Sequence, residues 1–111
     1  MSDYDENYAE NLSYIYDTLS DDDLKLQIVE EASELIQAIC KLRRSTNGTN
    51  PTPVSIMDAQ KAVYEEIADT LVAIDAALDT SEKVGVSSIQ RVKAERWAQR
   101  IREARSNEAQ T

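Results

Sequence analysis

Apolar side chains recur along the chain at the three- and four-residue spacing that is typical of helices. The first set predicts a helix over roughly residues 4 to 19 and consists of Tyr4, Tyr8, Leu12, Ile15 and Leu19. Ser20 and the three aspartates after it favour an N-cap with acidic residues in the first turn. A second helix is therefore expected over about residues 21 to 44, ending in the basic sequence KLRR.

Turn-forming residues gather in the stretch STNGTNPTPV, residues 45 to 54, which is expected to be a loop. Ser55 and Asp58 resemble a capping arrangement that opens a third helix ending near residue 79. Ser87 and Gln90 match a capping box that is predicted to open a fourth helix ending near residue 105. Four helices joined by short loops predict an all-α four-helix bundle, formed as a single domain over residues 1 to 111.

Composition narrows the possible chemistry. The chain has 41% hydrophobic and 30% charged residues, and no apolar run approaches the length of a membrane span. Its N-terminal sequence lacks the features of a signal peptide, and the lone Cys40 cannot form an internal disulfide, so a cytoplasmic location is expected. The chain contains no histidine and no Gly-rich phosphate loop, which excludes imidazole catalysis and a P-loop. Catalytic chemistry in this chain would therefore depend on carboxylates.

Charge is distributed unevenly along the chain. Lys and Arg number 12 against 21 Asp and Glu, for a net charge of −9. Residues 1 to 82 hold five basic and eighteen acidic side chains, whereas residues 83 to 111 hold seven basic and three acidic ones. Such an acidic chain is not expected to bind nucleic acid, which requires basic surface. Binding of a small anionic ligand through a metal ion is still compatible with this charge.

Two glutamates of the second helix lie on its packing side. With an advance of about 100° per residue from Leu24, Glu31 falls at about −20°, inside the apolar stripe, and Glu34 at about −80°, on its edge. Burying an unpaired carboxylate costs several kcal/mol, so this position implies a compensating cation. The alternative is an ordinary solvated face.

The third helix repeats this pattern. Glu66 lies about 60° from Val63 on the helical wheel, and Asp69 follows one turn later. Small residues on that side leave open volume beside the acids, namely Ala59, Ala62, Ala73, Ala76 and Ala77. If the two helices pack antiparallel, four carboxylates converge, and an all-oxygen ligand set suits Mg²⁺ or Mn²⁺. Otherwise these are two unrelated solvated faces.

The sequences EEASE at 30 to 34 and EEIAD at 65 to 69 resemble the EExxE and ExxD motifs of the MazG-like all-α nucleoside triphosphate pyrophosphohydrolases, over about residues 24 to 100. The resemblance implies a helical bundle assembled as an oligomer, which uses Mg²⁺ to release monophosphate and pyrophosphate from a nucleotide. It also implies that Glu30 orients water or a second metal ion. The metal ligands that it implies are Glu31, Glu34, Glu66 and Asp69.

The family also tends to carry a basic cluster on its last helix, and VKAERWAQR at 92 to 100 resembles this cluster. Its three cationic side chains lie within about 40° of Ile89 on the helical wheel and form one strip. A lysine on the Glu34 side of the second helix could stabilise the leaving pyrophosphate. The candidate substrate-binding residues are Lys93, Arg96, Arg100, Lys41 and Gln27. The alternative is that the strip only pairs with acidic helix surfaces.

Some apolar residues fall well outside these stripes. Val29 and Ile36 lie about 120° to 140° from Leu24, and Val72 lies opposite Val63. Helices of this kind need neighbours on more than one side, which predicts a homodimer or homotetramer. The alternative to an enzyme is a noncatalytic helical module that binds a nucleotide, a metal ion or another protein.

Overall fold

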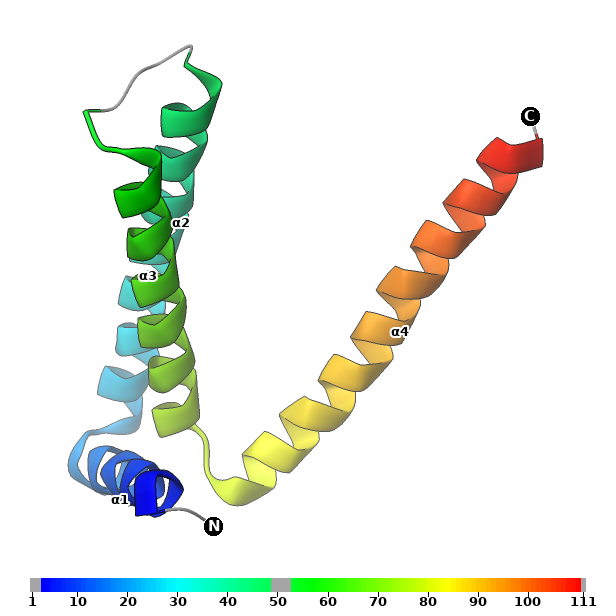
Figure 1. Ribbon diagram of the computed structural model, residues 1–111. Coiled ribbons are helices and arrows are strands. Elements are labelled where there is room, and N and C mark those ends of the chain that lie inside the picture. The colour runs from blue at the N-terminus through cyan, green and yellow to red at the C-terminus, as the bar shows by residue number, and fades with distance from the viewer. Residues whose placement is uncertain (1–2, 49–52, 111) are drawn as a thin grey trace. The chain divides into compact units, whose positions relative to one another are not determined.

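The computed structural model describes residues 3–48 and 53–110, and within these ranges it contains helices and no strand. The helices are α1 (Asp3–Thr18), α2 (Asp21–Asn47), α3 (Ile56–Ala77) and α4 (Thr80–Gln110) (Figure 1). The predicted all-α class is confirmed. None of these helices is both long enough and apolar enough to cross a membrane. Residues 49 to 52 of the predicted loop and the side chain of Tyr4 lie outside the described part of the chain.

The start of α2 follows the predicted cap. Ser20 adopts an extended conformation, and its hydroxyl accepts a hydrogen bond from the Asp23 amide at 3.1 Å. The helix continues three residues past the predicted end, to Asn47, and Gly48 then stops it with a φ of 70°. This left-handed conformation favours glycine, because a side chain there would be strained. Residues 45 to 47 are therefore helical and not part of the loop.

The start predicted for the last helix is wrong. Instead of beginning at Ser87, α4 begins at Thr80 behind a reciprocal cap. The amide of Glu82 donates to the Asp79 carboxylate at 2.8 Å, and the Asp79 amide donates to the Glu82 carboxylate at 3.0 Å. This capping box satisfies amide groups that the first turn otherwise leaves unpaired. The helix then runs through Gly85 and Ser87 without interruption.

The chain divides into two compact units, Met1–Ala77 and Leu78–Thr111. In the first unit, α2 and α3 pack side by side in antiparallel directions, and α1 packs against α3 near one end of this pair (Figure 1). The Tyr8 hydroxyl ties α1 to α3 by donating to the Asp75 carboxylate at 2.9 Å. Small residues dominate the core, which allows close approach of the helices and consists of Leu12, Leu24, Ala38, Ala59, Val63, Ala73 and Ala76.

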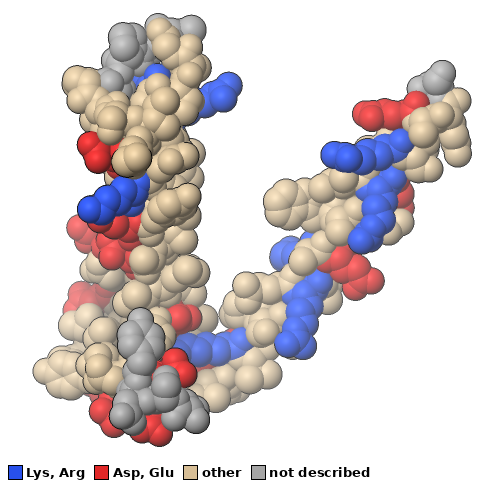
Figure 2. Space-filling view, in the orientation of Figure 1, with Lys and Arg blue, Asp and Glu red and all other residues tan. Residues whose placement is uncertain are grey.

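The second unit is dominated by α4. None of its residues between 80 and 110 is buried, and basic side chains are spread along the whole helix (Figure 2). Apolar residues are interspersed among them, so α4 shows no single apolar stripe. By contrast, α2 has an apolar stripe predicted from its sequence at Leu24, Ile28, Leu35, Ile39 and Leu42. Four of these residues are buried or half-buried, whereas Ile39 is 50% exposed, contrary to the prediction.

Candidate functional site

One face of the α2–α3 pair carries two facing rows of residues. On α2 the row follows the helical spacing of three and four and consists of Gln27, Glu31, Glu34, Ala38 and Lys41. On α3 the facing row has the same spacing and consists of Ala59, Ala62, Glu66, Asp69, Ala73 and Ala76. Beside these small residues the surface is hollowed into two cavities along this face, which together form a groove. We refer to it as the α2–α3 groove.

Three carboxylates meet in the middle of the groove. Glu31, Glu34 and Glu66 each place one oxygen atom so that all three oxygens lie within 4.8 Å of one another. Glu31 and Glu66 are half-buried and Glu34 is exposed. Acidic side chains are prominent over the α2–α3 part of the molecular surface (Figure 2). Carboxylates this close repel one another unless a cation or a proton separates them.

The two half-buried glutamates lack neutralising partners. One oxygen of each, Oε2, is inaccessible to solvent and has no hydrogen-bond partner among the residues that the structure describes. Burial raises the pKa of both carboxyl groups, and the negative charges of Glu34 and Asp69 raise each pKa further. Each of these effects disfavours the charged form in the metal-free protein. A bound cation would reverse the effect, because it stabilises the carboxylates.

The sequence places Asp69 one turn from Glu66, and the structure places it beside the cluster. Asp69 lines the same cavity as Glu31, and its charge contributes to the raised pKa of Glu31 and of Glu66. The group within 4.8 Å consists of the three glutamates and does not include Asp69. Asp69 is therefore close enough to act on the cluster electrostatically.

Gln27 fixes one of the cluster's side chains. Its amide Nε2 donates a hydrogen bond to Oε1 of Glu31 at 2.9 Å, one helical turn away. This bond orients the Glu31 carboxylate and opposes the rise of its pKa. Gln27 thus lies in the groove, as a substrate-binding residue must, and it also holds a glutamate of the cluster in position.

A cavity of about 360 Å³ opens on the α1 side of the cluster. Glu31, Asp69 and Gln27 form its polar wall. The remaining lining residues are apolar and come from all three helices of the first unit, namely Ile15, Leu19, Leu24, Val72, Ala73 and Ala76. We call this space the apolar cavity.

A second cavity of about 280 Å³ opens on the other side of the cluster. Glu34 and Glu66 form its acidic wall, and Lys41 supplies its cationic group. The other lining residues are Gln37, Ala38, Val54, Ala59 and Ala62. We call this space the lysine cavity, and the carboxylate cluster therefore lies between two chemically different spaces.

The carboxylate cluster fits a divalent metal ion of the magnesium class. Its donor atoms are all carboxylate oxygens, which are the ligands that Mg²⁺ and Mn²⁺ prefer. Two oxygens bound to one Mg²⁺ lie about 3 to 4.2 Å apart, and the three glutamate oxygens lie within 4.8 Å of one another, which is close to this range. The buried Oε2 atoms of Glu31 and Glu66 would gain the partner that they lack.

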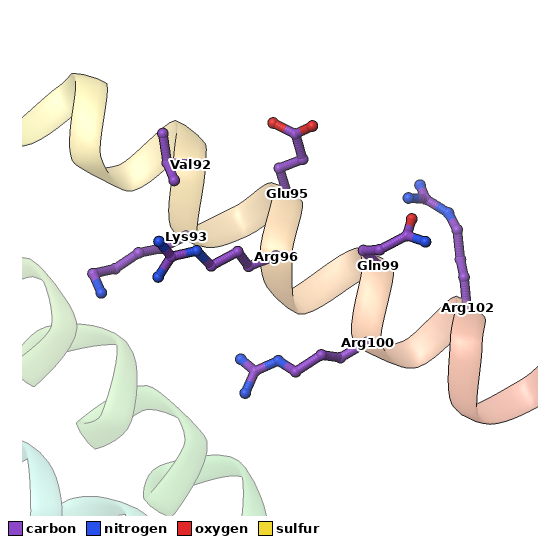
Figure 3. Close-up of a pocket in the computed structure, with 7 residues that line it drawn as sticks. All are labelled: Val92, Lys93, Glu95, Arg96, Gln99, Arg100 and Arg102. Carbon is purple, nitrogen blue, oxygen red and sulfur yellow. The ribbon is translucent and has the colours of Figure 1, made fainter.

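The other predicted site residues are not among the three carboxylates of the cluster. Glu30 is exposed on α2, and its carboxylate is not among the three that lie within 4.8 Å of one another. Three cations lie on α4, in the second unit, and their side chains point to the same side of that helix (Figure 3). They are Lys93, Arg96 and Arg100, whereas Glu95 and Arg102 point to the other side (Figure 3).

The contribution of α1 to the groove was missed in the sequence. Ile15 and Leu19 belong to the apolar periodicity of the first helix, which predicts packing and does not distinguish a core residue from a cavity wall. Leu19 is 44% exposed, although it lies next to buried apolar residues. The available signal was Ser20, which caps α2 and leaves only two residues between the end of α1 and the start of α2.

Comparisons with known proteins give no match for this chain, whether to a protein family, to a curated protein or to a solved structure.

Proposed function

We propose that this protein is a Mg²⁺-dependent nucleotide pyrophosphohydrolase of the MazG-like kind, which cleaves a ribo- or deoxyribonucleoside triphosphate to monophosphate and pyrophosphate. The observation that carries this proposal is the meeting of Glu31, Glu34 and Glu66 in a groove, with two of their oxygens buried and unpartnered. Such carboxylates support a metal site better than a solvated face. The cavities on both sides leave room for a substrate.

The proposed reaction needs no protein nucleophile. A water oxygen bonds to the α-phosphorus, the bond from that phosphorus to the α,β-bridging oxygen breaks, and its electron pair leaves with pyrophosphate. One proton of the water is released to solvent, and the other stays on the oxygen that is now bonded to the α-phosphorus. A metal ion held by the cluster would polarise the phosphoryl oxygens and neutralise the repulsion between triphosphate and carboxylates.

Each predicted residue has a role in this proposal. Glu31, Glu34, Glu66 and Asp69 hold the metal ion, and Glu30 orients the attacking water. Gln27 positions Glu31 through its hydrogen bond. The cations proposed to bind the phosphates are Lys41, Lys93, Arg96 and Arg100. The proposal also includes a four-helix bundle and a homodimeric or homotetrameric assembly.

The test is an assay of purified protein with a panel of nucleoside di- and triphosphates, with Mg²⁺ or with a chelator. Hydrolysis should require Mg²⁺, and Glu66→Gln should lower kcat at least about a hundredfold, or about 2.7 kcal/mol of barrier. The neighbouring Glu65 is exposed and outside the cluster, so Glu65→Gln serves as the matched control.

Two outcomes would contradict the proposal. One is full activity of Glu66→Gln with intact helicity, and the other is hydrolysis that continues in chelator. If the wild-type protein binds Mn²⁺ and nucleotides but turns over none of the panel, the noncatalytic binding module is the correct interpretation.

A further inference from the structure

The α2–α3 groove is chemically different at its two ends. Its row on α2 extends from Gln27 to Lys41, which is about 21 Å at the helical rise of 1.5 Å per residue. The carboxylate cluster lies near the middle, the apolar cavity on the α1 side and the lysine cavity on the other side. A ligand that spans the cluster therefore meets an apolar wall at one end and a cation at the other.

We infer that the groove binds its nucleotide in one direction, with the nucleoside in the apolar cavity and the β- and γ-phosphates in the lysine cavity. This inference rests on the proposed function and adds the orientation of the substrate and the residues that select its organic part. Ala76 and Leu19 then limit the size of the nucleoside, and Lys41 binds the leaving pyrophosphate.

The apolar cavity suits the nucleoside. Six of its nine lining residues are apolar, and two of these, Ala73 and Ala76 on α3, are small. A base gains stability when its ring is removed from water against such walls. Its polar wall contains two carboxylates and one amide and no cation. Phosphates placed there would meet negative charge on one side and apolar surface on the other, which disfavours the opposite orientation.

The lysine cavity suits the departing phosphates. Lys41 is the only cation among the residues that line the two cavities. It follows Glu34 by seven residues, so it lies on the same side of α2, about 10 Å further along the helix. When the bond between the α-phosphorus and the bridging oxygen breaks, negative charge grows on the pyrophosphate. Lys41 would stabilise that charge at the correct end of the groove.

The experiment measures ligand affinity by calorimetry in the presence of Mg²⁺, and so tests the two ends of the groove separately. The ligands are a nucleoside triphosphate and inorganic tripolyphosphate, which has no nucleoside. Ala76→Leu fills the apolar cavity and should weaken nucleoside triphosphate binding at least about tenfold, while leaving tripolyphosphate binding unchanged. Lys41→Gln should weaken the binding of nucleoside triphosphate and of tripolyphosphate about tenfold. It should leave the binding of nucleoside monophosphate unchanged.

Matched controls lie outside the groove on α3. Ala68→Leu adds the same bulk and Lys61→Gln removes the same charge, and both should bind all three ligands like wild type. Ala76 is only 4% exposed, so Ala76→Leu could unfold the protein. Leu19→Trp, at a position directly after α1 that is 44% exposed, then tests the same cavity from its other side.

Other outcomes overturn the inference. Loss of tripolyphosphate binding in a variant at Ala76 or Leu19 that keeps the helicity of the wild type would contradict the orientation. Unchanged tripolyphosphate binding in Lys41→Gln would also contradict it. Mn²⁺ binding distinguishes this failure from failure of the proposed function. If the wild-type protein binds neither Mn²⁺ nor nucleotide, both proposals are wrong. If the wild type binds and hydrolyses nucleotide but the variants show the opposite ligand preferences, only the orientation is contradicted.

Discussion

At the residue scale, the site depends on which side of a helix each acid occupies. Glu30 and Glu31 are adjacent in sequence, yet Glu30 is exposed and Glu31 is half-buried against α3. The same contrast separates Glu65 from Glu66. A difference of about 100° around the helix therefore distinguishes a solvated acid from one that needs a partner.

The pH dependence of stability tests these two glutamates in the absence of metal. Because burial raises the pKa of Glu31 and of Glu66, the folded protein binds protons more tightly there than the unfolded chain does. The stabilisation by protons is complete below the ordinary carboxyl pKa of 4.5 and is lost as the pH rises through the raised pKa.

We therefore expect Glu31→Gln to raise the melting temperature in chelator above that pH range and to have little effect below it. Thermal denaturation followed by circular dichroism at a series of pH values measures this difference. Mg²⁺ should stabilise wild type more than the variant, since it binds the charged form. An equal melting temperature of variant and wild type at neutral pH would show that Glu31 is not destabilised by its surroundings.

At the element scale, the sequence predicts the helices better than their ends. Apolar periodicity and the Ser20 cap correctly place the start of α2. The alanines beside the acids of α3 correctly indicate that cavities lie next to the carboxylates. The start of α4 is not determined by the sequence pattern, because two pairs of residues have capping-box spacing. These pairs are Asp79 with Glu82 and Ser87 with Gln90. The choice between two such motifs depends on which one forms the reciprocal hydrogen bonds, and this information is not contained in the spacing.

Substitution of the cap residue tests the observed start of α4. Asp79→Ala removes the acceptor of the Glu82 amide and should cost about 1 kcal/mol of helix stability. Ser87→Ala, in the helix interior, should stabilise the helix slightly, because alanine is the better helix former. The rate of amide hydrogen exchange over residues 80 to 83 measures the effect of each substitution on the first turn of α4. Faster exchange in the Ser87 variant than in the Asp79 variant would contradict the assignment.

At the scale of the whole molecule, large apolar side chains lie exposed on α2 and α3. On α2, Val29 and Ile36 are each 63% exposed, and on α3, Tyr64 and Leu71 are also exposed. Exposed apolar side chains that gather into one patch are typical of a protein interface. The exposure of these residues agrees with the sequence-based expectation that both helices need neighbours on more than one side.

We predict that the protein is a homodimer or homotetramer and that Ile36→Asp shifts it toward the monomer, since the change would bury a charge in the interface. Light scattering coupled to size-exclusion chromatography at micromolar concentration measures the mass of both proteins. A monomeric mass for the wild type would contradict the prediction.

The identity of the first products tests the proposed function most directly. The nucleoside triphosphate that the protein prefers would be hydrolysed with Mg²⁺ in heavy-oxygen water, and the products would be analysed by mass spectrometry. Attack at the α-phosphorus predicts labelled nucleoside monophosphate and unlabelled pyrophosphate in equal amounts, with no diphosphate at any time. Nucleoside diphosphate and orthophosphate as the first products would show attack at the γ-phosphorus and contradict the pyrophosphohydrolase assignment.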